Sequence, residues 1–179
     1  MLRSVLLINV IFIIFLTNTV FAIDAKNVPK DQRSKAGLYF SAQEASDYME
    51  KHAKSTLFVD VRDPGEIFTV GMPVAVDANV PFKRINATKW DAKKKTFGLD
   101  LNPRFVKMLE AQRKAKHLSK KDTIILICGS GLRSAGAANA LSKVGYTRVY
   151  SVVDGFGGWK RDNQEWTKKL NRKKLKTIK

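Results

Sequence analysis

Cys128, the only cysteine in the 179-residue chain, is followed five residues later by Arg133. The four residues between them are Gly129, Ser130, Gly131 and Leu132. A thiolate is the nucleophilic form of cysteine, and a helix N-terminus or a nearby arginine favours it. Successive main-chain N–H groups in such a loop can turn inward as a nest of donors, and glycine permits the backbone angles needed. We therefore predict a cradle for an anionic sulfur, with Cys128 as nucleophile and the fork of Arg133 reaching an incoming oxyanion.

The segments around this loop predict its place in the fold. Thr123–Ile127 is apolar on both faces, which is typical of a buried parallel strand. After the loop, apolar and small residues recur at helical spacing until Gly145, and Thr147–Val153 supplies another strand. Cys128 is thus expected at the carboxyl end of a central strand, where open α/β sheets bind ligands. A lone cysteine at a strand end is more often a small buried apolar residue, but this setting favours a functional one.

The rest of the chain alternates short apolar runs with helical patterns, which predicts β-α-β units and a mainly parallel sheet. The capping box Ser41–Glu44 predicts a helix that ends near His52. Leu57–Val61 is expected to be a strand that stops at the turn Asp63–Gly65. Val74–Val80 predicts a short edge strand.

The middle of the chain is harder to interpret. Asn102-Pro103 predicts a helix start, with the helix ending near His117. The preceding Lys83–Leu101 is basic and poorly periodic, and we interpret it as an ordered insertion or a long loop. The two histidines, His52 and His117, are far apart in the sequence, so we expect surface positions and no metal site or dyad.

The first 22 residues have the pattern of an export signal. Val5–Leu16 is apolar but shorter than the roughly 20 residues that a spanning helix needs. Val20 and Ala22 occupy the −3 and −1 positions, where signal peptidase accepts such residues. We therefore expect cleavage after Ala22, a periplasmic or secreted protein, and no stable membrane insertion. An uncleaved anchor is the alternative. We divide the remainder into a polar leader arm (23–36), a single domain (37–167) and a basic tail (168–179).

Charge and cysteine content limit the partners. The net charge is +17, and much of it lies in the tail, which could attract acidic partners or anionic membranes but is more simply a solvated terminus. Nucleic acid is not an expected partner of an exported protein. One cysteine excludes an internal disulfide, and a lone thiol in an oxidising compartment is either buried and inert or reactive.

Three motifs together resemble the rhodanese superfamily across about residues 38–166. Ile127–Ala138 (ICGSGLRSAGAA) is similar to its active-site loop. Leu57–Glu66 (LFVDVRDPGE) resembles its Asp-x-Arg strand motif, and Val149–Trp159 resembles its closing strand and turn. The resemblance implies an α/β fold with a central five-stranded, mainly parallel sheet flanked by helices.

The resemblance also implies a two-step sulfur transfer without metal or organic cofactor. Cys128 would take sulfur from a small anionic donor such as thiosulfate, forming a persulfide and releasing sulfite. Cyanide, a thiol or a protein would then accept the sulfur. Residues 129–133 would bind the donor and the persulfide, with Arg133 orienting the donor. Asp60 and Arg62 would brace the loop.

Some features depart from the family pattern, and rival functions stay open. Gly71–Val76 lacks the family's usual histidine and, with the insertion at Lys83–Leu101, leaves substrate preference undetermined. Phosphatases and arsenate reductases of this fold need five residues between cysteine and arginine, but here there are four. A module that only carries sulfur or binds a partner is the other alternative to an enzyme.

Overall fold

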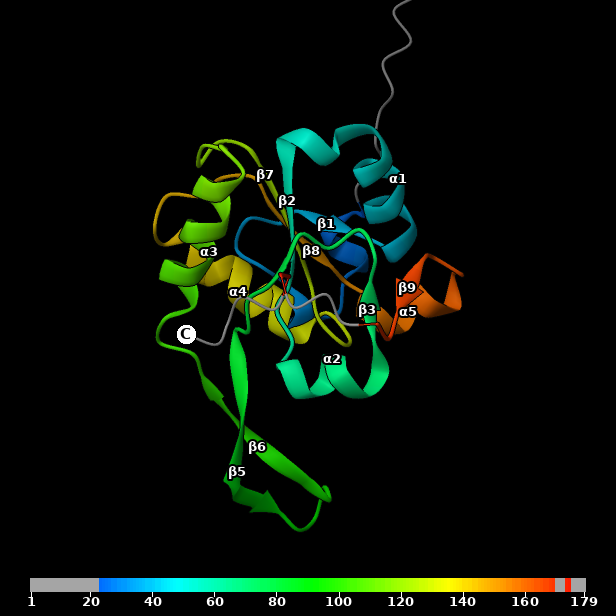
Figure 1. Cartoon of the computed structure of the whole chain (residues 1–179), viewed down its shortest axis with the longest axis vertical. Coiled ribbons are helices and arrows are strands. Elements are labelled where there is room, and N and C mark those ends of the chain that lie inside the picture. The colour runs from blue at the N-terminus through cyan, green and yellow to red at the C-terminus, as the bar shows by residue number, and fades with distance from the viewer. Residues whose placement is uncertain (1–22, 170–172, 175–179) are drawn as a thin grey trace, which may run out of the picture.

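A five-stranded sheet lies at the centre of the computed structural model, which describes residues 23–169 and 173–174 (Figure 1). Its strand order is β1-β8-β7-β2-β4, and every neighbouring pair is parallel. Its strands are β1 (Tyr39–Phe40), β2 (Thr56–Asp60), β4 (Ala78–Asn79), β7 (Thr123–Ile127) and β8 (Val149–Val152). The predicted fold class is confirmed, and β4 is the predicted short edge strand. The export leader predicted for residues 1–22 lies outside the described residues.

Helices cover both faces of this sheet (Figure 1). One face packs against α3 (Phe105–Ala115) and α4 (Leu132–Ser142). The other packs against α1 (Ala42–His52), α2 (Pro64–Val70) and α5 (Gly155–Arg161). Successive side chains of a strand point to opposite faces, so a strand buried on both faces must be apolar throughout. In β7, Ile124 and Leu126 enter the first core, and Ile125 and Ile127 enter the second.

Smaller elements complete the described part of the chain. The 3-10 helices are η1 (Ala25–Asn27), η2 (Lys30–Gln32) and η3 (Ala53–Ser55). Two antiparallel pairs lie outside the central sheet: β3 (Met72–Pro73) with β9 (Trp166–Thr167), and β5 (Lys83–Asp91) with β6 (Thr96–Leu101).

Two helices begin with reciprocal capping boxes. At α1, the Ser41 hydroxyl accepts from the Glu44 N–H at 3.1 Å, and the Glu44 carboxylate accepts from the Ser41 N–H at 2.7 Å. The helix therefore starts and ends as predicted. At α2, Asp63 and Glu66 form the same arrangement. Each box satisfies N–H groups that have no partner within the helix.

Helix α3 begins later than predicted. It starts at Phe105, whereas Asn102-Pro103 predicted the start. The Asn102 side chain accepts from the Arg104 N–H at 3.1 Å, and its main-chain carbonyl accepts from the Phe105 N–H at 3.1 Å. The asparagine thus stabilises a turn before the helix, an alternative that short polar side chains regularly offer to capping.

The insertion at Lys83–Leu101 is the β5–β6 hairpin, which projects from the domain in Figure 1. Its strand pattern was hidden because the register shifts between Asn86 and Trp90. Ile85 and Trp90 are five residues apart and would point to opposite faces of a regular strand. Across the irregularity they pair with Leu99 and Phe97, which share one face. A bulge of this kind breaks the sequence period while keeping the sheet two-sided.

The described part of the basic tail is not simply solvated. The Lys174 carbonyl accepts from the Asn79 N–H at 2.9 Å, and its ammonium donates to the Val74 carbonyl at 2.7 Å. An edge strand presents unpaired N–H groups that need acceptors, and Lys174 supplies one. None of the helices in the described part of the chain has the length and apolar character needed to cross a membrane.

Candidate active site

Cys128 lies directly after β7, at the carboxyl end of the central strand, as predicted. Gly131 has a left-handed backbone conformation (φ +84°) and is the N-cap of α4, which begins at Leu132. The segment Cys128–Arg133, here called the active-site loop, therefore turns the chain from the strand into the helix.

The first two carbonyls of the active-site loop are held from outside by α5. The Cys128 carbonyl accepts from the Phe156 N–H at 2.7 Å, and the Gly129 carbonyl accepts from the Gly157 N–H at 3.2 Å. Both donors lie in the first turn of α5, where N–H groups have no partner within the helix. The carbonyls of the loop and the free N–H groups of α5 thereby satisfy each other's hydrogen-bonding needs.

The next two carbonyls also have partners outside the hollow of the loop. The Ser130 carbonyl accepts from the Gln32 side-chain amide at 2.9 Å. The Gly131 carbonyl accepts from the Ala135 N–H at 3.1 Å. Gln32 ends η2 in the predicted leader arm, so this arm contacts the active-site loop.

These four bonds orient the N–H groups of residues 129–132. All described peptide bonds are trans, and in a trans peptide the N–H points opposite to the C=O. With the carbonyls of residues 128–131 bonded outward, the following N–H groups face the hollow. No hydrogen bond among the described residues uses the N–H groups of Gly129, Ser130 or Gly131 as donors. The geometry thus provides the predicted set of inward donors, here called the amide nest.

Close packing around the loop requires glycine at two positions. A Cβ on Gly131 would lie 2.2 Å from the Val153 carbonyl oxygen, and one on Gly155 would lie 2.6 Å from the Gly129 main chain. Both residues also have positive φ angles. The backbone of the loop is therefore in direct contact with the segment between β8 and α5.

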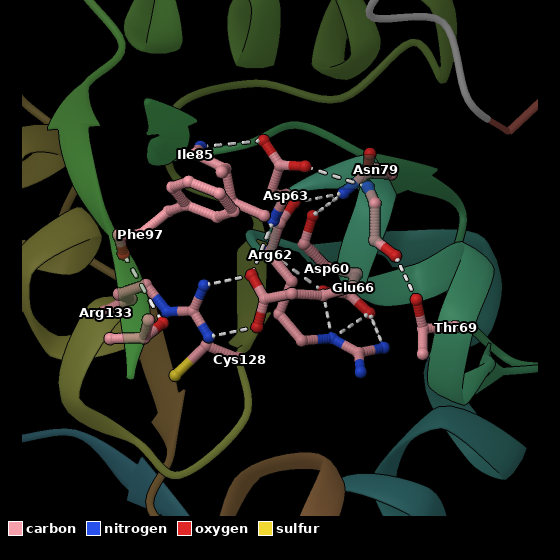
Figure 2. A network of polar contacts seen from close by, with 12 residues as sticks. Asp60, Arg62, Asp63, Glu66, Thr69, Asn79, Ile85, Phe97, Cys128 and Arg133 are labelled. Atoms are coloured by element: carbon pink, nitrogen blue, oxygen red, sulfur yellow. Dashed lines mark hydrogen bonds and ion pairs between the residues drawn. The ribbon is translucent and has the colours of Figure 1, made fainter. Parts of the chain in front are cut away.

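Arg133 differs from the expectation that its fork is open to an oxyanion. Its guanidinium forms a bidentate ion pair with Glu66 of α2, with Nη2 2.7 Å from Oε1 and Nη1 bonded to Oε2. Figure 2 shows this pair beside Cys128. The paired carboxylate matches the planar fork, the geometry in which arginine binds carboxylates most strongly. Arg133 lies at the start of the helix, as predicted, but its guanidinium is bonded to Glu66 of the same chain.

Both members of the pair are ionised at neutral pH. Burial alone raises the pKa of Glu66, but the hydrogen bonds and charge of Arg133 outweigh burial and lower it below 4.5. Burial alone lowers the pKa of Arg133, but the hydrogen bond and charge of Glu66, and more weakly the charge of Cys128, raise it. A negative sulfur at Cys128 therefore stabilises the cation at Arg133.

The sulfur is enclosed, although the predicted cradle must admit an incoming donor. Cys128 is only 1% exposed, and its Sγ lies 3.6 Å from the Ser134 hydroxyl. Ser134 donates to the Gly131 carbonyl at 2.9 Å and accepts from the Ser151 hydroxyl at 2.8 Å. The Ser134 hydroxyl can rotate between the carbonyl and the sulfur, so it adds a donor to the amide nest.

Asp60 and Arg62 form a buried brace, in line with the structural role expected of them. The guanidinium bonds the Asp60 carboxylate at 2.6 Å and the Gly71 carbonyl at 2.8 Å. Arg62 also stacks on the Phe156 ring, 4.2 Å from its centroid, and the main-chain N–H of Phe156 donates to the Cys128 carbonyl. The brace thus supports the loop through Phe156 and does not contact the sulfur.

Sequence reasoning missed several residues of the site: Gln32, Glu66, Ser134 and Ser151. Only Glu66 carried a local signal, because Asp63-Pro-Gly-Glu66 has the pattern of a capping box. Which arginine it faces depends on how α2 and α4 pack. His52 and His117 are exposed, as expected, and the described residues contain no group of three or more potential metal ligands among His, Cys, Asp and Glu.

Comparison with known proteins identifies the family of this domain. The model of the rhodanese-like domain family matches residues 41–162, most of the chain. The chain belongs to this family of α/β domains. Gln32 lies before the matched region, whereas the active-site loop, Glu66 and the β5–β6 hairpin lie within it.

Named relatives include sulfurtransferases. Thiosulfate sulfurtransferase 16, chloroplastic, of Arabidopsis thaliana is 30% identical over 105 residues, which is 59% of this chain and 74% of that protein. Thiosulfate sulfurtransferase GlpE of Tolumonas auensis is 38% identical over 45 residues, 25% of this chain and only 42% of that protein. A crystal structure from M. tuberculosis matches 72% of this chain and 96% of its own, with a TM-score of 0.53 and 22% identity, which supports the fold. Sulfur transfer is thus a function of the family.

Proposed function

We propose that this protein transfers sulfane sulfur from an anionic donor such as thiosulfate to a thiophilic acceptor, through a persulfide on Cys128. The observation that carries the proposal is the amide nest. Four consecutive carbonyls are bonded away from the sulfur, so four N–H groups converge on the space around it. Such a fixed set of donors stabilises a negative sulfur without reorganisation during the reaction.

The first step loads the cysteine. The Cys128 thiolate attacks the outer sulfur of thiosulfate, a new S–S bond forms, and sulfite leaves with the electron pair of the old one. The outer persulfide sulfur then carries the negative charge, which the amide nest and the Ser134 hydroxyl stabilise. In the second step, cyanide or a thiolate attacks that outer sulfur, and the Cys128 thiolate leaves.

Access to the sulfur involves Arg133. Because Cys128 is almost fully covered and the Arg133 fork is bonded to Glu66, we infer that an anionic donor competes with the Glu66 carboxylate for the guanidinium. Binding the donor would replace one oxyanion partner of Arg133 with another, and its cost is the ion pair with Glu66 that has to break. We also propose that the reaction takes place outside the cytoplasm, on the basis of the leader at residues 1–22.

Loading and turnover test the proposal together. After incubation with thiosulfate, intact-mass spectrometry should find one added sulfur atom, and peptide mapping should place it on Cys128. Cys128→Ser should abolish thiosulfate:cyanide turnover and leave the melting temperature nearly unchanged, because the two side chains are close in size. Sulfur on the protein after this substitution would contradict the assignment.

The enclosure of Cys128 favours one second candidate, a sulfur carrier that loads slowly and transfers to a dedicated partner. A covered sulfur protects a persulfide from loss to solvent. Steady-state assays separate the two functions, since a carrier would load one sulfur per chain and then stall with cyanide, whereas an enzyme would turn over.

A further inference from the structure

The β5–β6 hairpin has an unpartnered apolar face. Strand pairing places five large apolar residues on one side of the hairpin, and their exposed fractions range from 39% to 63%. This apolar face consists of Ile85, Trp90, Phe97, Leu99 and Leu101. The opposite side carries hydrogen-bonded polar groups, including Asn86 and Asp100 at 2.6 Å. Large exposed apolar side chains gathered on one face of a domain mark a binding site.

The apolar face begins beside the active site. The Ile85 N–H donates to the Asp63 carboxylate at 3.1 Å (Figure 2). The Ile85 side chain lies next to Gly65 of α2. Three residues further along α2, on the same side of the helix, Phe68 is 75% exposed. Asp63 caps the helix that carries Glu66, the partner of Arg133. A short chain of contacts thus connects the hairpin to the active-site loop.

Charge indicates the kind of partner. Residues 83–101 contain six basic and two acidic residues, a net charge of +4. At the base of the hairpin, Arg84 and Arg104 line an open groove of about 430 Å³. Interfaces pair apolar centres with a rim of complementary charge, so the matching surface is apolar with acidic residues around it. A second copy of this chain would bring two basic hairpins together, which like charges disfavour.

We propose that the apolar face docks an acidic protein whose cysteine exchanges sulfur with Cys128. This inference rests on the proposed function and names the partner class for it. A small ion such as thiosulfate gains nothing from five apolar side chains, whereas a protein partner buries them. Sulfur is carried on cysteines of proteins or on small thiols rather than on lipids, and this favours a protein over a membrane as the occupant.

Site-specific photo-crosslinking in the cells that make the protein tests the docking. A benzophenone amino acid in place of Trp90 should form an adduct with an acidic, cysteine-containing protein. The matched control is Thr96, which is also exposed near the tip but lies on the opposite side, next to Asp91 in the strand pairing. Equal adducts at both positions, an adduct with a second copy or with lipid, or no adduct at all would overturn the proposal.

Transfer to the crosslinked partner provides the second readout. With purified partner and persulfide-loaded protein, Phe97→Ser with Leu99→Ser should slow sulfur transfer at least tenfold, and high salt should slow the wild type. Thiosulfate:cyanide turnover should stay within twofold. Unchanged transfer to the partner overturns the docking proposal. Absence of thiosulfate:cyanide turnover in the wild type would instead contradict the proposed enzymatic function, and the crosslink would still test the docking proposal.

Discussion

The active-site loop and the β5–β6 hairpin both follow the carboxyl ends of parallel strands, but they are stabilised in different ways. The carbonyls of Cys128, Gly129 and Ser130 have donors from α5 and η2, the Gly131 carbonyl has a donor from α4, and glycine allows backbones to touch. The two strands of the hairpin pair with each other, the Ile85 N–H bonds Asp63 at the base, and the large apolar side chains are left exposed. An isolated two-stranded hairpin is marginally stable in water, so a partner surface is a natural complement to it.

The two regions are stabilised differently because they bind different kinds of ligand. The loop must present fixed donors to one charged atom, and this requires bonds on its outer side. The hairpin must leave its apolar side chains free for a partner. Four substitutions, each with a matched control, test this contrast.

The largest effect is expected at the tightest contact in the loop. Gly131→Ala should lower the free energy of unfolding by about 3 kcal/mol or more, because the new Cβ meets the Val153 carbonyl and φ is positive. Gly145 has a similar φ but open space, so Gly145→Ala should cost only about 1–2 kcal/mol. Urea denaturation measures both. Equal costs would show that the loop is not tightly packed.

Removing the charge of Glu66 should have the next largest effect. Glu66→Gln should cost about 1–3 kcal/mol near neutral pH, as expected for a charged hydrogen bond, and should lower the KM for thiosulfate by freeing Arg133. The folded-state pKa of Glu66 is lowered from its ordinary value of 4.5. The contribution of Glu66 to the stability of the fold is therefore present above pH 4.5 and is lost as the pH falls through the folded-state pKa. The gap between variant and wild type should therefore close in acid.

Glu44→Gln is the control for this variant. Glu44 occupies the same capping-box position in α1, and no ion pair with an arginine is described for it. Its substitution removes the negative charge but keeps an oxygen that can accept from the Ser41 N–H, so it should leave the KM for thiosulfate unchanged. A stability gap for Glu66→Gln that widens toward acid pH would contradict a lowered pKa of the Glu66 carboxyl in the folded protein.

Loss of the bond from the leader arm should have a moderate effect on activity. Gln32→Leu removes the donor to the Ser130 carbonyl, so the Gly131 N–H is no longer fixed in the amide nest. Turnover should fall about tenfold, less than for loss of a whole oxyanion donor, with a stability cost of about 1 kcal/mol. Gln43→Leu removes surface bonds to Asp47 and Gln164 and should not change turnover. Equal turnover of both variants would exclude a positioning role.

The smallest effect is expected in the hairpin. Leu99→Ala should change the free energy of unfolding by less than about 0.5 kcal/mol, because the side chain is exposed. Leu126→Ala, in the buried strand β7, should cost about 2–5 kcal/mol. Thermal denaturation compares them. A cost at Leu99 approaching that at Leu126 would mean that the apolar face is already covered within the monomer.

Local patterns in the sequence were sufficient for much of the fold and for the position of the nucleophile. Thr123–Ile127 is apolar throughout because both faces are buried, and the loop after it has glycines where the backbone must turn. The capping box at Ser41 fixed the start of α1. The helix start predicted at Asn102 was wrong because an asparagine side chain can either cap a helix or stabilise a turn. The hairpin stayed hidden because a bulge broke its period.

Sequence alone determined the strand–loop–helix setting of Cys128, since hydrophobic period, glycine placement and turn chemistry act over a few neighbouring residues. Only the tertiary structure decided what surrounds it. Gln32, Glu66 and Ser151 reach the loop from segments far away in the chain, and the Arg133 fork is occupied for the same reason. Such contacts depend on how helices and strands pack, and packing is a property of the whole chain rather than of any window within it.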